Sequence, residues 1–334
     1  MRIEPFSLSL STPLDTAAGS IDKRRGFLVR LDIDGTPGLG EATPLPGWTE
    51  SLDDCEAALR NVDDPEAAVD GGRLDETPAA RHGVSLALLD SRARAAGQPL
   101  YRYLGADAHV ECVPVNATVG DGSPEATAEA AAAAVAEGFP AVKTKVGARS
   151  LSEDVARLEA VRKRCPEVEL RADANGAWDR ETGERALSAF ADLGVAFVEQ
   201  PLSADELSGH AALRGGSVGI ALDEGLYEHG IDAILDSEAA DVVVCKPMAL
   251  GGIDRAADVA HRAIDAGLDV VVTTTIDGGM ARAAAVHLAA ALPAVRASGL
   301  ATRGLLAEDI RENVASIASG TAAVPQGKGN IPPS

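Results

Sequence analysis

The chain reads AVKTKV at residues 141–146, VELRAD at 168–173 and VAFVEQ at 195–200, three short runs of strand type. Further runs of this kind are VPVNATV (113–119), VGIALDE (218–224), DVVVCK (241–246) and DVVVTT (269–274), with a weaker candidate near residues 295–300. Segments rich in Ala, Glu and Arg, such as 126–139 and 152–164, lie between these runs and favour helix. A strand–helix unit repeated at about 25 residues predicts a (β/α) barrel, with a doubly wound open sheet as the main alternative.

The segments that flank these repeats have a different pattern. FSLSLST (6–12) and GFLVRLDIDG (26–35) predict antiparallel strands, and HGVSLALLDSRARAAG (82–97) predicts a helix. Beyond residue 308 the chain returns to Gly, Pro and small residues, with a possible last strand at TAAVP (321–325). We therefore expect an α/β protein with a (β/α)7β TIM-like barrel over residues 111–308. An N-terminal α+β capping domain of residues 1–110 is expected to be completed by the tail, 309–334.

The composition excludes some classes of partner. The chain has 334 residues, with 30 Lys and Arg against 51 Asp and Glu, which gives a net charge of −21. A surface of this charge does not bind nucleic acid or an anionic membrane by general attraction. No apolar run is long enough to span a membrane, and the N-terminus lacks a basic region followed by an apolar one, so we expect a cytoplasmic protein. The four cysteines show no C-x-x-C spacing, which argues against a zinc site or a disulfide framework.

Lysine is scarce in this chain. Only six of the 30 basic residues are lysines. Acidity combined with few lysines leads us to hypothesise a surface adapted to concentrated salt, where screening weakens the repulsion between carboxylates.

Polar residues follow the expected barrel strands where each strand ends. The active site of a (β/α) barrel lies at these carboxyl ends. The residues concerned are Lys143 and Lys145, then Arg171, Asp173 and Asn175, then Glu199, then Asp223 and Glu224, and finally Lys246. Because strand side chains alternate, the first two share one face of their strand, as do the next three. Taken singly, a K-x-K is more often a solvated edge than a catalytic pair, and an Asp after a strand is more often a helix N-cap, so the convergence of these residues is the signal.

The residue types predict a specific chemistry. Asp173, Glu199 and Asp223 form a hard oxygen site of charge −3, which suits Mg²⁺, with Mn²⁺ as an alternative. Lys145 and Lys246 flank these carboxylates on opposite sides. This arrangement fits removal of a proton next to the carboxylate of a small-molecule substrate, because a divalent ion stabilises the resulting negative charge. Arg171 is expected either to pair with a metal carboxylate or to contact the substrate.

The order of these signatures resembles the enolase superfamily. K-x-K, D-x-N, E-Q-P, D-E and K-P occur on successive expected strands, and that superfamily combines a Lys or His base with Mg²⁺. The K-x-K and the Lys of the sixth strand are similar to the muconate lactonizing subgroup. The mandelate racemase subgroup has a His at the end of the seventh strand, where this chain has Thr273–Thr275, and His287 is expected to be a packed helix residue.

Within that subgroup, several segments resemble the o-succinylbenzoate synthases. They are residues 40–48 (GEATPLPGW), 114–118 (PVNAT), 273–279 (TTTIDGG) and 299–302 (GLAT). The resemblance implies a hydro-lyase that dehydrates 2-succinyl-6-hydroxy-2,4-cyclohexadiene-1-carboxylate to 2-succinylbenzoate, a step of menaquinone synthesis, through a metal-stabilised enediolate. Lys145 would be the base and Lys246 a fixed cation. The substrate-binding or supporting residues would be Lys143, Arg171, Asn175, Glu224, Thr274, Asp277, Gly278 and Gly279.

The chain departs from the family pattern at the last of these segments. Asp277 stands where the family has Glu, and Gly278 and Gly279 replace small hydroxyl residues, which leaves backbone N–H groups to bind a substrate carboxylate. The main alternative is an N-succinylamino acid racemase or another racemase or epimerase of the same subgroup. The missing D-x-D after the eighth strand counts against a dipeptide epimerase. A non-catalytic binding barrel is disfavoured, because the whole set of strand-end residues is present. Trp48 and Trp178 are expected to be packed side chains, with a place in the lining of the pocket as the alternative.

Overall fold

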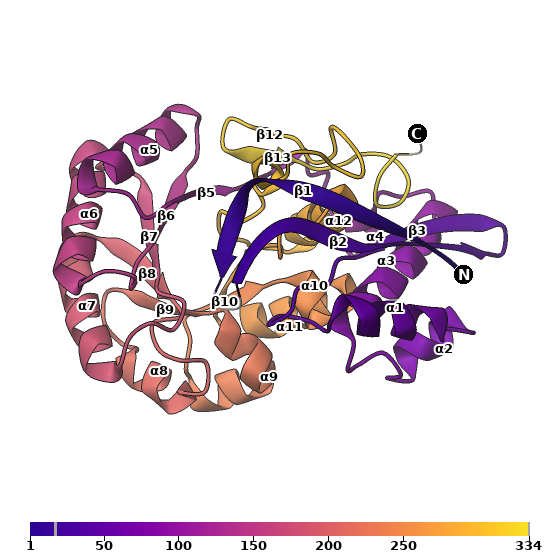
Figure 1. The fold of residues 1–334 in the computed structure, drawn as a ribbon, viewed down its shortest axis with the longest axis horizontal. Coiled ribbons are helices and arrows are strands. Elements are labelled where there is room, and N and C mark those ends of the chain that lie inside the picture. The colour runs from indigo at the N-terminus through magenta and orange to yellow at the C-terminus, as the bar shows by residue number, and fades with distance from the viewer. Residues whose placement is uncertain (17–18, 333–334) are drawn as a thin grey trace.

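A computed structural model of the protein describes residues 1–16 and 19–332. Its centre is a seven-stranded parallel sheet in the order β11-β10-β9-β8-β7-β6-β5, which confirms the predicted strand repeat. Helices lie outside the curled strands (Figure 1). The strands are β5 (Asn116–Val119), β6 (Ala141–Lys145), β7 (Glu169–Asp173), β8 (Val195–Glu199), β9 (Gly219–Leu222), β10 (Val242–Cys245) and β11 (Asp269–Val272).

An eighth segment joins the two edges of this sheet, near the weak candidate at 295–300. The Ser298 N–H donates to the Pro114 carbonyl at 2.9 Å, and the Gly299 N–H donates to the Val272 carbonyl at 2.9 Å. The segment thus bonds to the chain at the start of β5 and to β11 at once. The fold is therefore a (β/α)7β barrel closed by a short, irregular eighth strand.

The helices that follow the strands begin at clear sequence signals. Ser150 caps α6, and its hydroxyl and the Glu153 carboxylate form a reciprocal capping box. Pro124 opens α5 at a position where its missing N–H costs nothing. None of the helices within residues 1–16 and 19–332 is both long and apolar enough to cross a membrane. The helices of the barrel are α5 (Pro124–Ala136), α6 (Leu151–Arg164), α7 (Arg180–Asp192), α8 (Leu207–Leu213), α9 (Glu224–Ser237), α10 (Pro247–Leu250), α11 (Ile253–Asp265) and α12 (Gly279–Ala291), followed by the 3-10 turn η1 (Arg303–Leu305).

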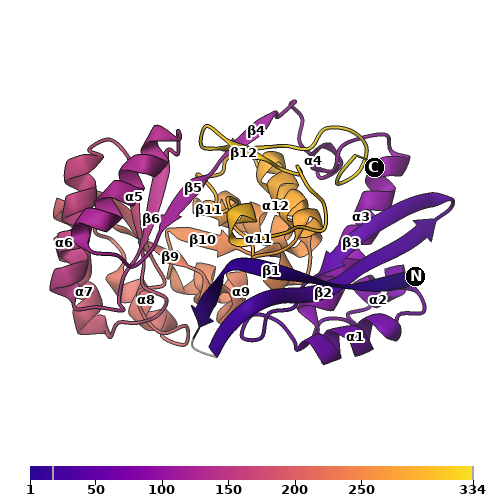
Figure 2. The ribbon, with the colours of Figure 1, turned by 45° about the horizontal axis from the view of Figure 1, so that its top comes forward.

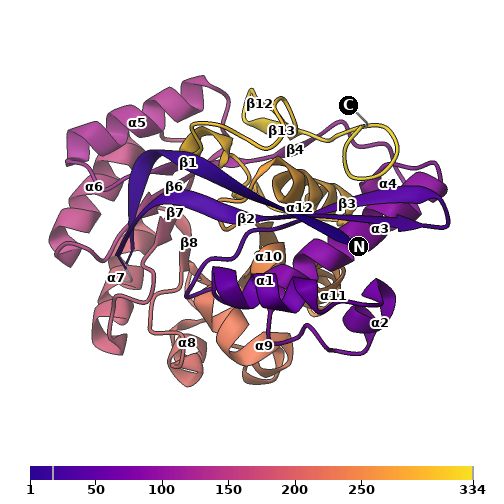
Figure 3. The same ribbon diagram turned by 45° about the vertical axis from the view of Figure 1, so that its right-hand side comes forward.

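The N-terminal segment forms a three-stranded antiparallel sheet with helices packed against it. Helix α3 packs so closely on β3 that a Cβ atom at Gly40 would lie 1.9 Å from the Gly83 carbonyl oxygen. Only glycine fits at this position. The β1–β2 hairpin reaches from this sheet toward the barrel strands (Figures 1 and 3). The elements are β1 (Arg2–Thr16), β2 (Gly19–Ile33), β3 (Thr36–Ala42), α1 (Leu52–Arg60), α2 (Pro65–Asp70), α3 (Pro78–Ala95) and α4 (Leu100–Tyr103).

The expected first barrel strand, 113–119, is two strands in the structure. β4 (Cys112–Pro114) pairs with β13 (Thr321–Ala323) of the tail, and only β5 belongs to the barrel. β13 also pairs with β12 (Ile317–Ala318), so the three strands form a small sheet in the order β12-β13-β4 (Figure 2). Farther along the tail, the Asn330 N–H donates to Asp90 of α3 at 2.6 Å. The tail thus contacts both the barrel and the N-terminal segment, and the division at residues 110 and 308 stays a prediction.

Candidate active site

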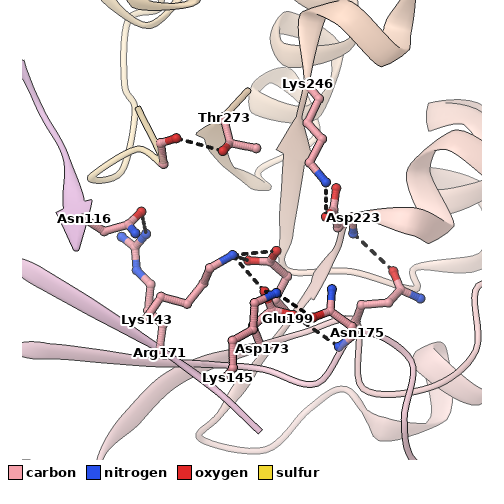
Figure 4. Close-up of polar contacts among 12 residues, drawn as sticks. Asn116, Lys143, Lys145, Arg171, Asp173, Asn175, Glu199, Asp223, Lys246 and Thr273 are labelled. Carbon is pink, nitrogen blue, oxygen red and sulfur yellow. Dashed lines mark hydrogen bonds and ion pairs between the residues drawn. The ribbon is translucent and has the colours of Figure 1, made fainter. Parts of the chain in front are cut away.

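The carboxyl ends of β6, β7 and β8 bring four predicted residues together. Strand register pairs Lys145 with Asp173 and Asp173 with Glu199, so these side chains lie at one height. The Lys143 Nζ lies 2.9 Å from Asp173 and 2.8 Å from Glu199. The Lys145 Nζ lies 2.7 Å from Asp173 (Figure 4). The alternation inferred from the sequence therefore gives the correct face for both lysines.

The charges of this cluster shift its proton affinities. Burial favours the neutral form of Lys143, but the carboxylates of Asp173 and Glu199 outweigh it and raise the pKa of Lys143. Burial opposes ionisation of Asp173 as well, but the two lysines outweigh it and hold the pKa of Asp173 well below its usual range. Lys143 and Asp173 are therefore a charged pair in the folded protein.

The opposite side of the site holds a second lysine. Lys246 follows β10 and forms an ion pair with Asp223, which follows β9. Figure 4 shows Lys246 reaching this carboxylate from the side opposite to Lys143 and Lys145. The Lys246 side chain is 11% exposed, whereas the Lys145 side chain is 43% exposed. The two lysines thus differ in access, and they pair with different carboxylates, Lys145 with Asp173 and Lys246 with Asp223.

The three carboxylates fit a divalent cation by their chemistry. All supply oxygen ligands at neighbouring strand ends, and the buried Asp223 Oδ1 has no hydrogen-bond partner among the residues that the structure describes. Burial raises the pKa of Glu199 and of Asp223, so nearby lysines do not fully compensate these carboxylates. In the positions shown by residues 1–16 and 19–332, ammonium groups lie between them, and no three Asp, Glu, His or Cys side chains already form a metal cage.

Two supporting residues adjoin this cluster as expected. The Asn175 Oδ1 accepts a hydrogen bond from the Lys145 ammonium at 2.5 Å, and its Nδ2 donates to Glu224 at 3.1 Å. Asn175 has a left-handed backbone, with φ of 45°, which turns its side chain back toward the site. Asn175 therefore connects the exposed lysine to Glu224.

Arg171 has partners other than the expected ones. Its guanidinium bonds to Glu169 at 2.7 Å, to the Ala297 carbonyl at 2.6 Å and to Asn116 at 3.3 Å. The side chain lies on the same face of β7 as Asp173. Because Arg171 comes two residues earlier in the strand, it lies one layer deeper in the barrel. The expected pairing with a metal carboxylate is therefore wrong, and Arg171 joins β7 to the closing segment.

The expected use of Gly278 and Gly279 is also corrected, because carboxylates of the chain already occupy their amides. The Gly278 N–H donates to Glu41 of β3 at 2.7 Å, and the same carboxylate accepts from Met280 and Ala281. The Gly279 N–H donates to Asp309 at 2.7 Å. The start of α12 is an anion site, as expected of a helix N-terminus, but its anions are internal.

Thr274 and Asp277, which precede α12, bond to nearby residues of the chain. Asp277 is buried and accepts from the Thr275 hydroxyl at 2.5 Å, while the Thr274 hydroxyl lies 3.0 Å from that of Thr302. Burial and the charge of Asp277 raise the pKa of Glu41 to about 7, although the Thr43 hydroxyl and backbone amides lower it. Substrate contacts by Thr274 and Asp277 stay predictions.

Arg24 and Arg25 of β2 behave differently. The Arg24 guanidinium is buried and donates to the Thr43 and Pro44 carbonyls at 2.8 and 3.0 Å and to the Ile276 carbonyl at 3.2 Å. Arg24 therefore fixes the loop after β3 beside the loop after β11. Arg25 is exposed.

Sequence reasoning missed two residues whose side chains bond to the backbone of the strand ends. The buried Arg157 of α6 donates to the Lys145 carbonyl at 2.8 Å. The Gln200 Oε1 accepts from the Asp223 N–H at 3.2 Å, and Gln200 has a left-handed backbone, with φ of 43°. The E-Q-P signature contains Gln200, but only the fold reveals its partner.

Trp48 lies beside Lys246. The centre of its ring is 3.3 Å from the Lys246 Nζ, and the ring contacts Tyr227 edge-on, with ring centroids 5.2 Å apart. The packing against Tyr227 is as expected, whereas the contact with Lys246 was not predicted. The only sequence signal was its place at the end of GEATPLPGW.

Family comparison agrees with the geometry of the strand ends. The model of the family described as "Enolase C-terminal domain-like" matches residues 125–330. The chain belongs to the enolase superfamily. A second model, "MenC, N-terminal domain", matches residues 3–91 of this superfamily member.

Individual superfamily relatives have different activities. The o-succinylbenzoate synthase of Thermobifida fusca is 42% identical over 206 residues, covering 60% of this chain and 62% of that protein. The L-Ala-D/L-Glu epimerase of Bacillus subtilis is 31% identical over 311 residues, covering 87% of this chain and 84% of that protein. A solved substrate-liganded complex of the latter epimerase aligns over 99% of this chain and 97% of its own, with 28% identity and a TM-score of 0.88. The superfamily is thus shown, while the relatives include both a synthase and an epimerase.

Proposed function

We propose that the chain dehydrates 2-succinyl-6-hydroxy-2,4-cyclohexadiene-1-carboxylate to 2-succinylbenzoate in menaquinone synthesis. The observation that carries the proposal is the asymmetry of the two lysines. Lys145 is 43% exposed, and Lys246 is 11% exposed, ion-paired with Asp223 and covered by Trp48. A dehydration that uses one face needs one mobile proton carrier and one fixed cation, whereas a racemase needs two proton carriers. The match to the MenC N-terminal domain supports the same reaction.

The proposed chemistry uses the residues of the strand ends. Lys145 removes the proton from the carbon next to the ring carboxylate and returns it to the departing hydroxyl on the same face. The C–H and C–O bonds break, water leaves, and the ring becomes aromatic. Lys246 faces the ring from the other side and stabilises the negative charge without exchanging a proton. Mg²⁺ held by Asp173, Glu199 and Asp223 would supply positive charge against the charge that develops on the substrate carboxylate.

Lys143 and Asn175 are proposed to hold the groups around Lys145 in place. Lys143 stays charged between Asp173 and Glu199, so it holds the two carboxylates in place. Asn175 accepts from the Lys145 ammonium at 2.5 Å and thereby orients it. Both residues are proposed to position the reacting groups and not to exchange protons with the substrate.

The alternative is an N-succinylamino acid racemase or another racemase or epimerase of the same subgroup. The similarity to the Bacillus subtilis epimerase over most of the chain favours it. In that case Lys145 and Lys246 would each exchange a proton, on opposite faces of the substrate.

A paired assay separates these functions. The chain with Mg²⁺ is given the cyclohexadiene substrate, followed by ultraviolet absorption, and separately N-succinyl amino acids and dipeptides in D₂O, followed by NMR. We expect aromatisation as the main activity. Exchange of the α-proton of an N-succinyl amino acid or dipeptide, without aromatisation, would overturn the proposal.

The Lys246→Arg variant sharpens the assay. A guanidinium remains a cation but is not a base at neutral pH. We expect part of the dehydration to remain and any racemisation to disappear. Racemisation that persists in this variant would show that the role given to Lys246 is wrong.

A further inference from the structure

The loop after β3 of the N-terminal segment reaches the barrel at Lys246. Trp48 is its tip, and the Lys246 Nζ lies 3.3 Å from the centre of the indole ring. This distance is well inside the range of about 6 Å over which an ammonium is attracted to an aromatic face, and Trp is the strongest partner for such a contact. The face of the indole ring is the part that attracts a cation, so this orientation indicates a cation–π contact and not only packing.

A tyrosine holds both members of this contact. The Tyr227 hydroxyl accepts the Lys246 backbone N–H at 2.5 Å and lies 3.3 Å from the Val244 carbonyl. The Tyr227 ring meets the Trp48 ring at 90°. Asp223 bonds to the Lys246 ammonium from the barrel side. The lysine is therefore bordered by an indole face from the loop after β3 and by a carboxylate and a phenol from the start of α9.

The loop that carries Trp48 is itself rigid. The Trp48 N–H donates to the Leu45 carbonyl at 2.9 Å, and the Leu45 N–H donates to the Thr49 hydroxyl at 2.7 Å. Gly47 has φ of 97°, a left-handed backbone that favours glycine. Hydrogen bonds within the turn therefore fix its backbone and, with it, the position of the indole ring.

The residue after this turn attaches it to α3. The Glu50 carboxylate accepts the N–H groups of Ala79 and Ala80 at 3.0 and 2.8 Å, at the start of that helix. The loop is held on both sides, because Arg24 binds the Thr43 and Pro44 carbonyls before it. The position of Trp48 therefore follows the position of the whole N-terminal segment.

We propose that Trp48 is a positioning residue that holds the Lys246 ammonium as a fixed cation facing the substrate. This role rests on the proposed function and deepens it, because it gives a physical reason for the unequal use of the two lysines. Lys145 has an amide and a carboxylate as partners and, among the described residues, no aromatic contact, and its 43% exposed side chain leaves the ammonium accessible to a substrate. The Lys246 ammonium is held by Asp223 and Trp48 and its backbone by Tyr227, so it stabilises charge from one place.

The first test compares two substitutions of Trp48. Trp48→Leu keeps an apolar side chain but removes the aromatic face, and Trp48→Phe keeps a smaller one. We expect the leucine variant to lower kcat for dehydration by about tenfold, equal to about 1.4 kcal/mol, with KM changed less than about threefold. The phenylalanine variant is expected to stay within about threefold of the parent. Equal losses in both variants, a change confined to KM, or an unchanged kcat would each overturn the role.

The second test does not depend on activity. Trp178→Phe leaves Trp48 as the only tryptophan, since the chain has two. In that background, Lys246→Met removes the ammonium from the indole face, and we expect the fluorescence emission of Trp48 to shift. Lys145→Met is the matched control and is expected to leave it unchanged. An emission that ignores Lys246→Met, or that responds equally to both, would overturn the contact. A shift with no dehydration in the parent chain would instead overturn the proposed function and leave the contact standing.

Discussion

The strand ends of β6 to β10 and the N-terminus of α12 are both polar, and both were expected to face a substrate. They differ in how their charges are satisfied. At the strand ends, Asp223 keeps a buried oxygen that has no hydrogen-bond partner within residues 1–16 and 19–332, and Lys145 is partly open to solvent. At α12, the internal carboxylates of Glu41 and Asp309 take the free amides of the helix.

The difference separates function from stability. A polar group left short of partners costs folding free energy and is retained where a ligand completes it. A polar group that is fully bonded inside the protein holds segments together. Changes at the strand ends should therefore reduce activity with little effect on folding, and changes at α12 should do the reverse.

The largest effect is expected for Lys145→Ala. Removing a proton carrier costs about 10²- to 10⁴-fold in rate, because general acid–base catalysis contributes on that order. The melting temperature should change by less than about 2 °C, since Asp173 keeps Lys143 as its partner. Steady-state rates and thermal unfolding check both parts. Lys163→Ala, at an exposed position of α6, is the control. A large loss of stability in Lys145→Ala would contradict the comparison.

Asp309→Ala should destabilise the fold by about 3–5 kcal/mol. It leaves Arg282, whose side chain is 1% exposed, as an unpaired buried charge, since the two groups lie 2.6 Å apart. The Gly279 amide also loses its acceptor. Denaturant unfolding measures the loss, and Glu312→Ala, which breaks an exposed pair with Arg303, should cost less than about 1 kcal/mol. Equal effects of the two variants would show that the α12 junction is not structural.

The pH dependence of stability is expected to reveal Glu41. Its folded pKa, about 7, lies above its ordinary value of 4.5, because burial and the charge of Asp277 disfavour ionisation. Its contribution to stability is therefore fully present below pH 4.5 and is lost as the pH rises through 7. Glu41→Gln cannot ionise, so the free energy of unfolding of the parent should fall relative to this variant between pH 5 and 8, by about 2–3 kcal/mol.

Denaturant unfolding at several pH values measures this difference. Glu4→Gln, at an exposed carboxylate that pairs with Arg30, is the control and should track the parent. A constant difference between the parent and Glu41→Gln at every pH would mean that Glu41 is ionised throughout.

The smallest effect is expected from the metal. Millimolar Mg²⁺ should raise the melting temperature by about 2–5 °C, because binding to the folded state alone adds up to about 3 kcal/mol at a hundredfold excess over Kd. Asp223→Asn should abolish the shift, whereas Asp232→Asn, at an exposed side chain, should keep it. An equal shift in both variants would remove the strand-end carboxylates as the metal site.

Sequence reasoning works where one regularity decides the position. The face of Lys143, Lys145 and Asp173 follows from strand alternation, and their meeting with Glu199 follows from the parallel arrangement of neighbouring strands. The same rule gives the correct face for Arg171 but not its depth, which sets its partners. The seven-stranded repeat was predictable for the same reason, whereas the break between β4 and β5 depends on pairing with the distant tail.

Sequence reasoning fails where the partner is far along the chain. Glu41 and the Gly278 amide are 237 positions apart, and no periodic pattern connects them. A glycine pair at a helix start predicts an anion site, but it does not predict whether the anion is a substrate or another part of the protein. Trp48 is a similar case, because its loop is held by Arg24 and Glu50 and only the fold brings it to Lys246.

The hydrogen bond from the Asn330 amide to Asp90 also has a consequence in time. The two residues are 240 positions apart. At about 5–20 residues per second, synthesis of that interval takes about 12–48 s, so Asp90 leaves the ribosome long before its partner exists. Helix α3 and the sheet beneath it are therefore synthesised early but gain their contact with the tail only at the end of synthesis. In the interval, this segment must persist without the hydrogen bond between Asn330 and Asp90.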